Sequence, residues 1–196
     1  MTYSVWLSFF SYTIISAISP GPNNILALNA AGKSGIKMQR RLLSGIYLGF
    51  FCIMIICGVF STVLAVILPE ITDYMKYAGA VYITWLAYHV ATGRPLKENN
   101  TETEKSSFNR GFLLQFVNVK IIIWGLTAFT GFVLPYYDSP IIIVGFIFLL
   151  SFIGNGSTHI WAVAGVGLGS LLKKYWRSAN IIMGLSLLYS AVNLVL

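Results

Sequence analysis

Six segments of the chain contain no charged residue, and polar stretches separate them. They cover residues 1–32, 42–69, 77–93, 121–137, 139–172 and 178–196. A helix needs about 20 predominantly apolar residues to cross the hydrocarbon core of a bilayer, and each segment is close to or above that length. The pattern therefore predicts an all-α integral membrane protein with six transmembrane helices.

The longest polar stretch, residues 93–107, has no apolar period and is typical of a loop. It divides one transmembrane domain, residues 1–196, into a first half of about 1–92 and a second half of about 108–196. Each half has an odd number of predicted crossings, so the second half is inverted in the membrane relative to the first. The sequence thus predicts two inverted three-helix halves.

Composition agrees with this prediction, and the placement of charge gives the orientation. Charged residues make up 10% of the chain, against about a quarter in a soluble domain. Most basic residues lie in the first, third and fifth loops or beside them: Lys33, Lys37, Arg40, Arg41, Arg94, Lys97, Lys105, Arg110, Lys173, Lys174 and Arg177. Because loops rich in Lys and Arg stay in the cytoplasm, we expect both termini to be periplasmic in a bacterial inner membrane. Topology thus explains the net charge of +7, and no nucleic-acid partner is expected.

The same charge pattern decides how residues 139–172 cross the membrane. They are long enough for two short helices. Two crossings would place Lys173, Lys174 and Arg177 outside, against the pattern. We therefore expect one long helix, either tilted or interrupted at residues 154–157.

The first predicted helix is interrupted at mid-depth by Ser19-Pro20-Gly21-Pro22-Asn23-Asn24. Each proline removes a backbone donor and disfavours helix in the residue before it, so a regular helix cannot continue. Backbone groups freed in the hydrocarbon region need protein or water partners, which favours a break that lines a cavity. A half-helix that starts at Asn23 and Asn24 would direct its amide groups into the break, where they favour anions. The alternative is a proline kink that only shapes the bundle.

Two later predicted helices carry polar clusters within apolar surroundings. In the fourth, Gln115, Asn118 and Lys120 lie together near mid-bilayer. Lys120 either serves a site there or extends its long side chain to the cytoplasmic interface. In the fifth, Asn155 and His159 share one helix face, which indicates a polar stripe toward a cavity. His159 is a candidate proton carrier, and a hydrogen-bonded structural histidine is the alternative.

Interrupted helices at corresponding positions of two inverted halves are the best sequence indication of a transporter's substrate site. Here the first and fourth helices are interrupted, and each begins a half. An interruption of the fifth helix is an open alternative. We therefore expect the substrate to bind between the breaks. The predicted substrate-binding residues are Ser19, Pro20, Gly21, Pro22, Asn23, Asn24, Gln115, Asn118, Lys120 and Asn155.

The same stretches carry a family resemblance. Residues 12–28, with Ser19-Pro20-Gly21-Pro22-Asn23-Asn24 near the centre, resemble the first-helix signature of the LysE/RhtB superfamily of amino-acid exporters. Similarity at residues 43–45, 78–87 and 114–120 extends the resemblance over essentially the whole chain. It implies an inner-membrane exporter of small neutral amino acids, such as cysteine or O-acetylserine, driven by the proton gradient through antiport. Many members have Asn-Pro-Lys where this chain has Asn118-Val119-Lys120, so a full break of the fourth helix is an open question.

We therefore expect a carrier for a small zwitterionic amino acid. Its carboxylate would bind at Asn23, Asn24 and the nearby helix amides, with help from Lys120. Its ammonium would bind carbonyls freed at residues 19–21. Protons and membrane lipid are the other expected partners, and a homodimer is an alternative to a monomer.

Other functions agree less well with the sequence. A channel for small polar solutes is the alternative, but a channel needs a continuous polar stripe in place of clusters. For an intramembrane hydrolase, Ser157 and His159 are two residues apart on one helix and cannot face each other, so no enzyme is predicted. Cys52 and Cys57 point in different directions on one helix and cannot form a disulfide. No residues have metal-ligand spacing, and neither a metal nor a cofactor is expected.

Overall fold

The computed structural model describes residues 1–19, 21–67 and 107–167, with scattered positions within 77–92 and 177–192. All regular structure in this part of the chain is helical. The elements are α1 (Tyr3–Ile18), α2 (Pro22–Ser34), α3 (Arg40–Ile67), α5 (Phe108–Val117), α6 (Val119–Thr127), the π-helix η1 (Ala128–Val133) and α7 (Pro140–Gly167). The predicted third and sixth helices lie largely outside the described residues, as does Pro20.

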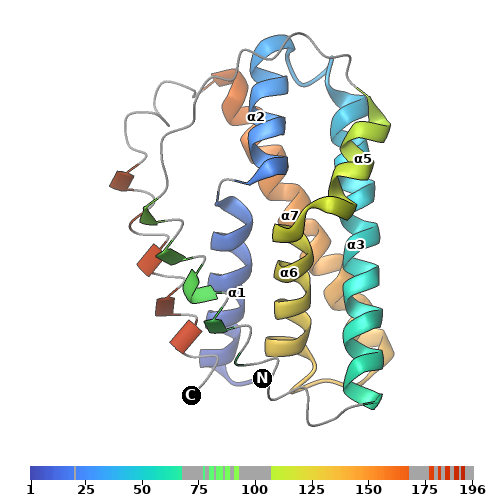
Figure 1. Cartoon of the computed structure of the whole chain (residues 1–196), viewed down its shortest axis with the longest axis vertical. Coiled ribbons are helices and arrows are strands. Elements are labelled where there is room, and N and C mark those ends of the chain that lie inside the picture. Colours follow the sequence, from blue (N-terminus) through green and yellow to red (C-terminus); the bar gives the residue numbers. More distant parts are fainter. Residues whose placement is uncertain are drawn as a thin grey trace.

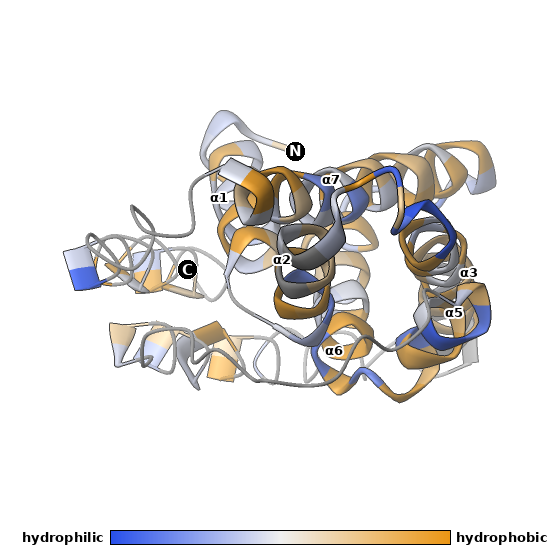
Figure 2. Cartoon of the chain, turned by 90° about the horizontal axis from the view of Figure 1, so that it is seen from above, coloured by the Kyte–Doolittle hydropathy of each residue, from blue (hydrophilic) through white to orange (hydrophobic). Residues whose placement is uncertain are grey.

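The described helices include segments that can cross a membrane. Arg40–Val63 and Pro140–Gly167 are long and apolar enough, with mean hydropathies of 2.4 and 2.0. A third span results if α5 and the helix that follows it count as one crossing with a bend of 58°. Viewed along the bundle, hydrophobic residues cover most of the ribbon (Figure 2). The all-α membrane fold is thus confirmed in outline, and the count of six crossings stays a prediction.

Two interrupted helices run antiparallel in the bundle, and their breaks lie close together (Figure 1). α1 rises from the end that carries the N-terminus, and α2 continues toward the opposite end. α5 begins at that opposite end, and α6 returns toward the first. The uninterrupted helices α3 and α7 extend over the height of the bundle beside them.

The break in the first helix is confirmed. α1 ends at Ile18, and Ser19 (φ −59°, ψ 146°) leaves the helical region. Gly21 is extended (φ −154°, ψ 174°), and α2 starts at Pro22, whose missing N–H would have no helical partner at that position. α2 ends at Ser34 and is followed by Gly35, whose φ of 79° lies in the left-handed region that glycine adopts without strain.

The break in the fourth helix is also confirmed, although no proline causes it. Asn118 (φ −83°, ψ 87°) ends α5 and starts α6. Its backbone N–H bonds the carbonyl of Gln115 (3.3 Å), and its own carbonyl accepts from Ile121 (3.1 Å). Asparagine favours such positions because its side chain competes with regular helical hydrogen bonding.

The alternative of an interruption in the fifth helix is wrong, because α7 runs unbroken through residues 154–157. Two glycines of α7, Gly154 and Gly165, allow close packing against neighbouring helices. A Cβ on Gly154 would overlap the ring of Phe50, and one on Gly165 would overlap the carbonyl oxygen of Leu28 on α2. Glycine lowers helix propensity by only about 1 kcal/mol, which packing offsets, whereas proline would have cost about 3 kcal/mol.

Candidate substrate site

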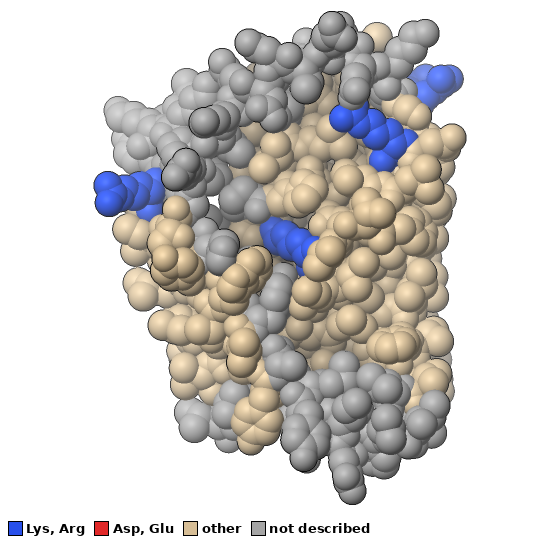
Figure 3. Space-filling view, in the orientation of Figure 1, with Lys and Arg blue, Asp and Glu red and all other residues tan. Residues whose placement is uncertain are grey.

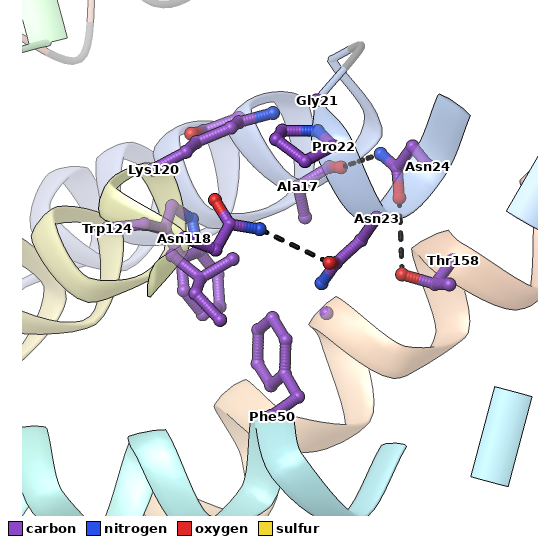
Figure 4. A pocket seen from close by; sticks show the side chains of 13 residues that line it. Ala17, Gly21, Pro22, Asn23, Asn24, Phe50, Asn118, Lys120, Trp124 and Thr158 are labelled. Atoms are coloured by element: carbon purple, nitrogen blue, oxygen red, sulfur yellow. Dashed lines mark hydrogen bonds between the residues drawn. The ribbon is translucent and has the colours of Figure 1, made fainter. Parts of the chain in front are cut away.

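A narrow cavity lies where the two breaks meet (Figure 4). Side chains from α1, α2, α3, α6 and α7, together with Asn118 between α5 and α6, line it. The lining residues are Ser16, Ala17, Gly21, Pro22, Asn23, Asn24, Phe50, Asn118, Lys120, Ile121, Trp124, Gly154 and Thr158. Six of the ten predicted substrate-binding residues are among them.

Amide side chains join the two breaks directly. The Nδ2 of Asn23 donates to Oε1 of Gln115 (2.6 Å), and the Nε2 of Gln115 donates back to Oδ1 of Asn23 (3.0 Å). The Nδ2 of Asn118 donates to the same Oδ1 of Asn23 (3.2 Å; Figure 4). All three side chains are buried, where unpaired amide groups would be costly. This network holds α2 against the junction of α5 and α6.

Asn24 closes the carboxyl end of α1. Its Nδ2 donates to the carbonyls of Ala17 (2.7 Å) and Ser19 (3.0 Å), which have no partner within the helix. Its Oδ1 accepts a hydrogen bond from Thr158 on α7 (3.2 Å). In Figure 4 the Asn24 side chain accordingly reaches toward Ala17 and Thr158. Asn24 therefore supports the break that exposes the cavity.

α7 supplies two more donors to carbonyls at this end of α1. The Oγ of Ser157 donates to Ala17 (2.8 Å), and Nε1 of Trp161 donates to Ile18 (2.8 Å). Ser157 is 3% exposed and Trp161 6% exposed, so these bonds replace water that the site excludes. α7 is thus the helix against which the end of α1 is fixed.

Lys120 places its ammonium group at the break of the first helix. Its Nζ donates to the carbonyl oxygen (2.8 Å) and the Oγ (2.7 Å) of Ser19, a residue with no exposed surface. The side chain also lies against Gly21, where a Cβ would be 2.9 Å from its Cδ. On the face drawn in Figure 3, one basic side chain lies near the middle, and the described residues that border it are uncharged. Lys120 is therefore directed into the site and does not extend to the cytoplasmic interface.

Three buried polar atoms of the cavity lining have no hydrogen-bond partner among the described residues. They are Oγ of Ser16, Oδ1 of Asn118 and Nε1 of Trp124. A buried donor or acceptor without a partner costs about 1–3 kcal/mol and needs an explanation. A polar molecule that binds at the breaks would supply the missing partners.

Four described residues of the predicted site lie outside this lining: Ser19, Gln115, Asn155 and His159. The Nδ2 of Asn155 donates to the carbonyl of Tyr47 on α3 (3.2 Å). Nδ1 of His159 forms a hydrogen bond with the hydroxyl of Tyr47 (2.8 Å), and His159 is exposed. Their face of α7 therefore contacts α3, while Gly154 and Thr158 face the cavity. Gln115 is fully buried and forms two hydrogen bonds with Asn23, which does line the cavity.

Comparisons with known proteins show which proteins the chain resembles. The family described as LysE type translocator matches residues 14–196. The cysteine/O-acetylserine efflux proteins of Escherichia coli O1:K1 and O157:H7 are each 44% identical to this chain over 194 residues, and that of strain K12 is 43% identical. In each case the match covers 99% of both chains. No solved structure shows significant similarity to the chain.

Proposed function

Since the chain belongs to the LysE family of translocators, we propose that it exports small neutral amino acids across the bacterial inner membrane, with cysteine and O-acetylserine as the first candidates. The observation that supports this most is the cavity between the two broken helices, with a lysine ammonium group at one break. Discontinuous helices of opposite direction are the usual setting for substrate binding in secondary transporters. Export would proceed by movement of one half of the bundle against the other around this site.

The substrate carboxylate would bind at the start of α2. The first amide groups of a helix have no intrahelical partners and carry partial positive charge, and those of Asn23 and Asn24 lie at this end. Lys120 adds a full charge beside Gly21, where its ammonium group is 2.8 Å from the carbonyl oxygen of Ser19. The two groups together favour an anion at this point.

The substrate ammonium would bind Oδ1 of Asn118. The carbonyls of residues 19–21 were the expected partners, but that of Ser19 already accepts hydrogen bonds from Lys120 and Asn24. Oδ1 of Asn118 is a buried acceptor without a partner in the described structure. Ser16, which also lines the cavity, has an unpartnered hydroxyl that can accept a second hydrogen bond. A zwitterion would thus fit with its two charged groups near the two breaks.

The test is transport by the purified protein in proteoliposomes. We expect saturable flux of cysteine or O-acetylserine, and accumulation against their concentration gradient when a proton gradient is imposed. An uncoupler should abolish that accumulation, because proton exchange supplies the driving force. Flux that stays linear in substrate concentration would instead identify a channel. Saturable but uncoupler-resistant accumulation would remove the proton from the mechanism.

His159 is the proposed proton carrier, acting through its bond to Tyr47. We expect His159→Gln to flatten the pH dependence of export, because glutamine keeps a hydrogen-bonding group but cannot titrate. The control is Tyr47→Phe, which removes the same bond and leaves the imidazole. If both variants change export equally at every pH, the pair has only a structural role.

The proposed orientation has both termini in the periplasm. Figure 1 places the N-terminus and the segment between η1 and α7 at the same end of the bundle. In a background without Cys52 and Cys57, we expect Thr2→Cys and Asp138→Cys to react with a membrane-impermeant maleimide in intact spheroplasts. Thr101→Cys should react only after lysis. The reverse pattern would overturn the orientation.

A further inference from the structure

The ring of Phe50 forms part of the cavity lining. Phe50 comes from α3 and is 3% exposed. Its ring packs edge-on against Trp124 of α6, with ring centroids 5.7 Å apart. Its tip rests on the backbone of Gly154 in α7, where a Cβ would overlap the ring. Three helices thus fix the position of this ring.

The cavity lining combines polar and apolar groups. Asn23, Asn118 and Lys120 supply polar groups, whereas Phe50, Ile121 and Trp124 supply apolar surface. Figure 4 shows the Phe50 ring directed from α3 toward the space beside Asn23 and Asn118. A zwitterion bound to the polar groups would therefore direct its side chain toward the apolar surface.

We propose that Phe50 limits the length of the substrate side chain and that Gly154 positions the ring for this role. The inference rests on the proposed function, since it concerns selectivity among amino acids at the same site. A rigid apolar wall discriminates by excluding the extra methylene groups of longer substrates. One methylene in such a pocket is worth roughly 10- to 200-fold in selectivity.

A purely structural role for Phe50 predicts a different result. Shortening a core side chain leaves space, lowers stability by a few kcal/mol and reduces the amount of active protein. All substrates would then lose transport by the same factor. The informative quantity is thus the ratio between long and short substrates, which a change in the amount of folded protein does not alter.

The experiment uses unbranched amino acids of increasing length as competitors of cysteine or O-acetylserine flux in proteoliposomes. In the wild type we expect α-aminobutyrate to compete well and norleucine poorly. Phe50→Leu should increase the competition by norleucine, relative to that by α-aminobutyrate, by at least about tenfold, because the ring no longer blocks the longer side chain. Gly154→Ala should change the ratio in the opposite direction, since the added methyl displaces the ring. Gly156→Ala is the matched control, because open space surrounds that position on the same helix.

The outcomes separate the inference from the proposed function. If Phe50→Leu transports cysteine or O-acetylserine and retains the wild-type ratio, the inference is wrong and the proposed function stands. Should that variant not fold, Phe50→Met provides the same comparison with less loss of volume. A wild-type protein that transports no amino acid would overturn the proposed function, and the inference would fail with it.

Discussion

Gly111→Ala is expected to separate α3 from α5 and to lower the stability of the protein sharply. A Cβ at Gly111 would overlap the carbonyl oxygen of Leu42, and one at Gly45 on the opposite helix would overlap that of Phe108. Because backbone atoms cannot rotate away as side chains do, the helices themselves must move. Overpacking of this kind costs about 1–3 kcal/mol in soluble cores, and we expect at least the upper value here. Small residues that allow close backbone approach are a main source of helix association in membranes.

Thermal unfolding in detergent measures this effect, and Gly145→Ala is the matched control. Gly145 lies within α7 with nothing near the position of a Cβ, so alanine there should leave the melting temperature unchanged or raise it slightly through higher helix propensity. Gly111→Ala should instead melt far lower and lose export in proportion to the folded fraction. Equal melting temperatures for the two variants would show that the α3–α5 contact is looser than the structure indicates.

Local chemistry explains which features of the fold the sequence predicts. The break before Pro22 follows from the loss of backbone donors, and the break at Asn118 follows from polar residues inside an apolar segment. Both are properties of a few neighbouring residues. The reciprocal hydrogen bonds between Asn23 and Gln115 join residues 92 positions apart, and no local pattern specifies them.

The site residues of α7 show why a helical period alone is insufficient. Asn155 and His159 share one face, and that face contacts α3. Gly154 and Thr158 have the same spacing on the neighbouring face, and they line the cavity. The period establishes that two residues lie on one face, but the packing of α7 against α1 and α2 decides which pair faces the cavity. Phe50 and Trp124 escaped prediction for a similar reason, since apolar residues in a membrane helix carry no local sign of a site.

Lys120→Met is expected to abolish most export while the protein stays folded. Methionine has a similar length but no charge, so it removes the ammonium group that lies between Ser19 and the start of α2. The carbonyl of Ser19 keeps its hydrogen bond from Asn24, which limits the loss of stability. A hydrogen bond to a charged group contributes about 1.5–3 kcal/mol, which corresponds to a loss of roughly 10- to 100-fold in substrate affinity.

Two measurements distinguish a role of Lys120 in substrate binding from a purely structural role at the carboxyl end of α1. They are the initial export rates over a range of substrate concentrations and the thermal stability of the protein. A role in binding predicts a raised apparent KM with a melting temperature near that of the wild type. A structural role, in which Lys120 only stabilises the carboxyl end of α1, predicts a lowered melting temperature, a reduced maximal rate and an unchanged KM. Lys37→Met is the matched control, because it removes one exposed positive charge that is not part of the cavity lining.

Gly21→Ala tests the ammonium group of Lys120 without removing its charge. Its Cβ would lie 2.9 Å from Cδ and 3.0 Å from Nζ of Lys120, which is the flexible end of a long side chain and can shift. We expect the displaced ammonium group to raise the apparent KM less than Lys120→Met does, with little change in stability. Because the two variants act on one group, the double variant should be no worse than Lys120→Met alone. Additive losses would instead mean that Gly21 contributes to the site independently of the lysine, through the close approach of its own backbone to the substrate.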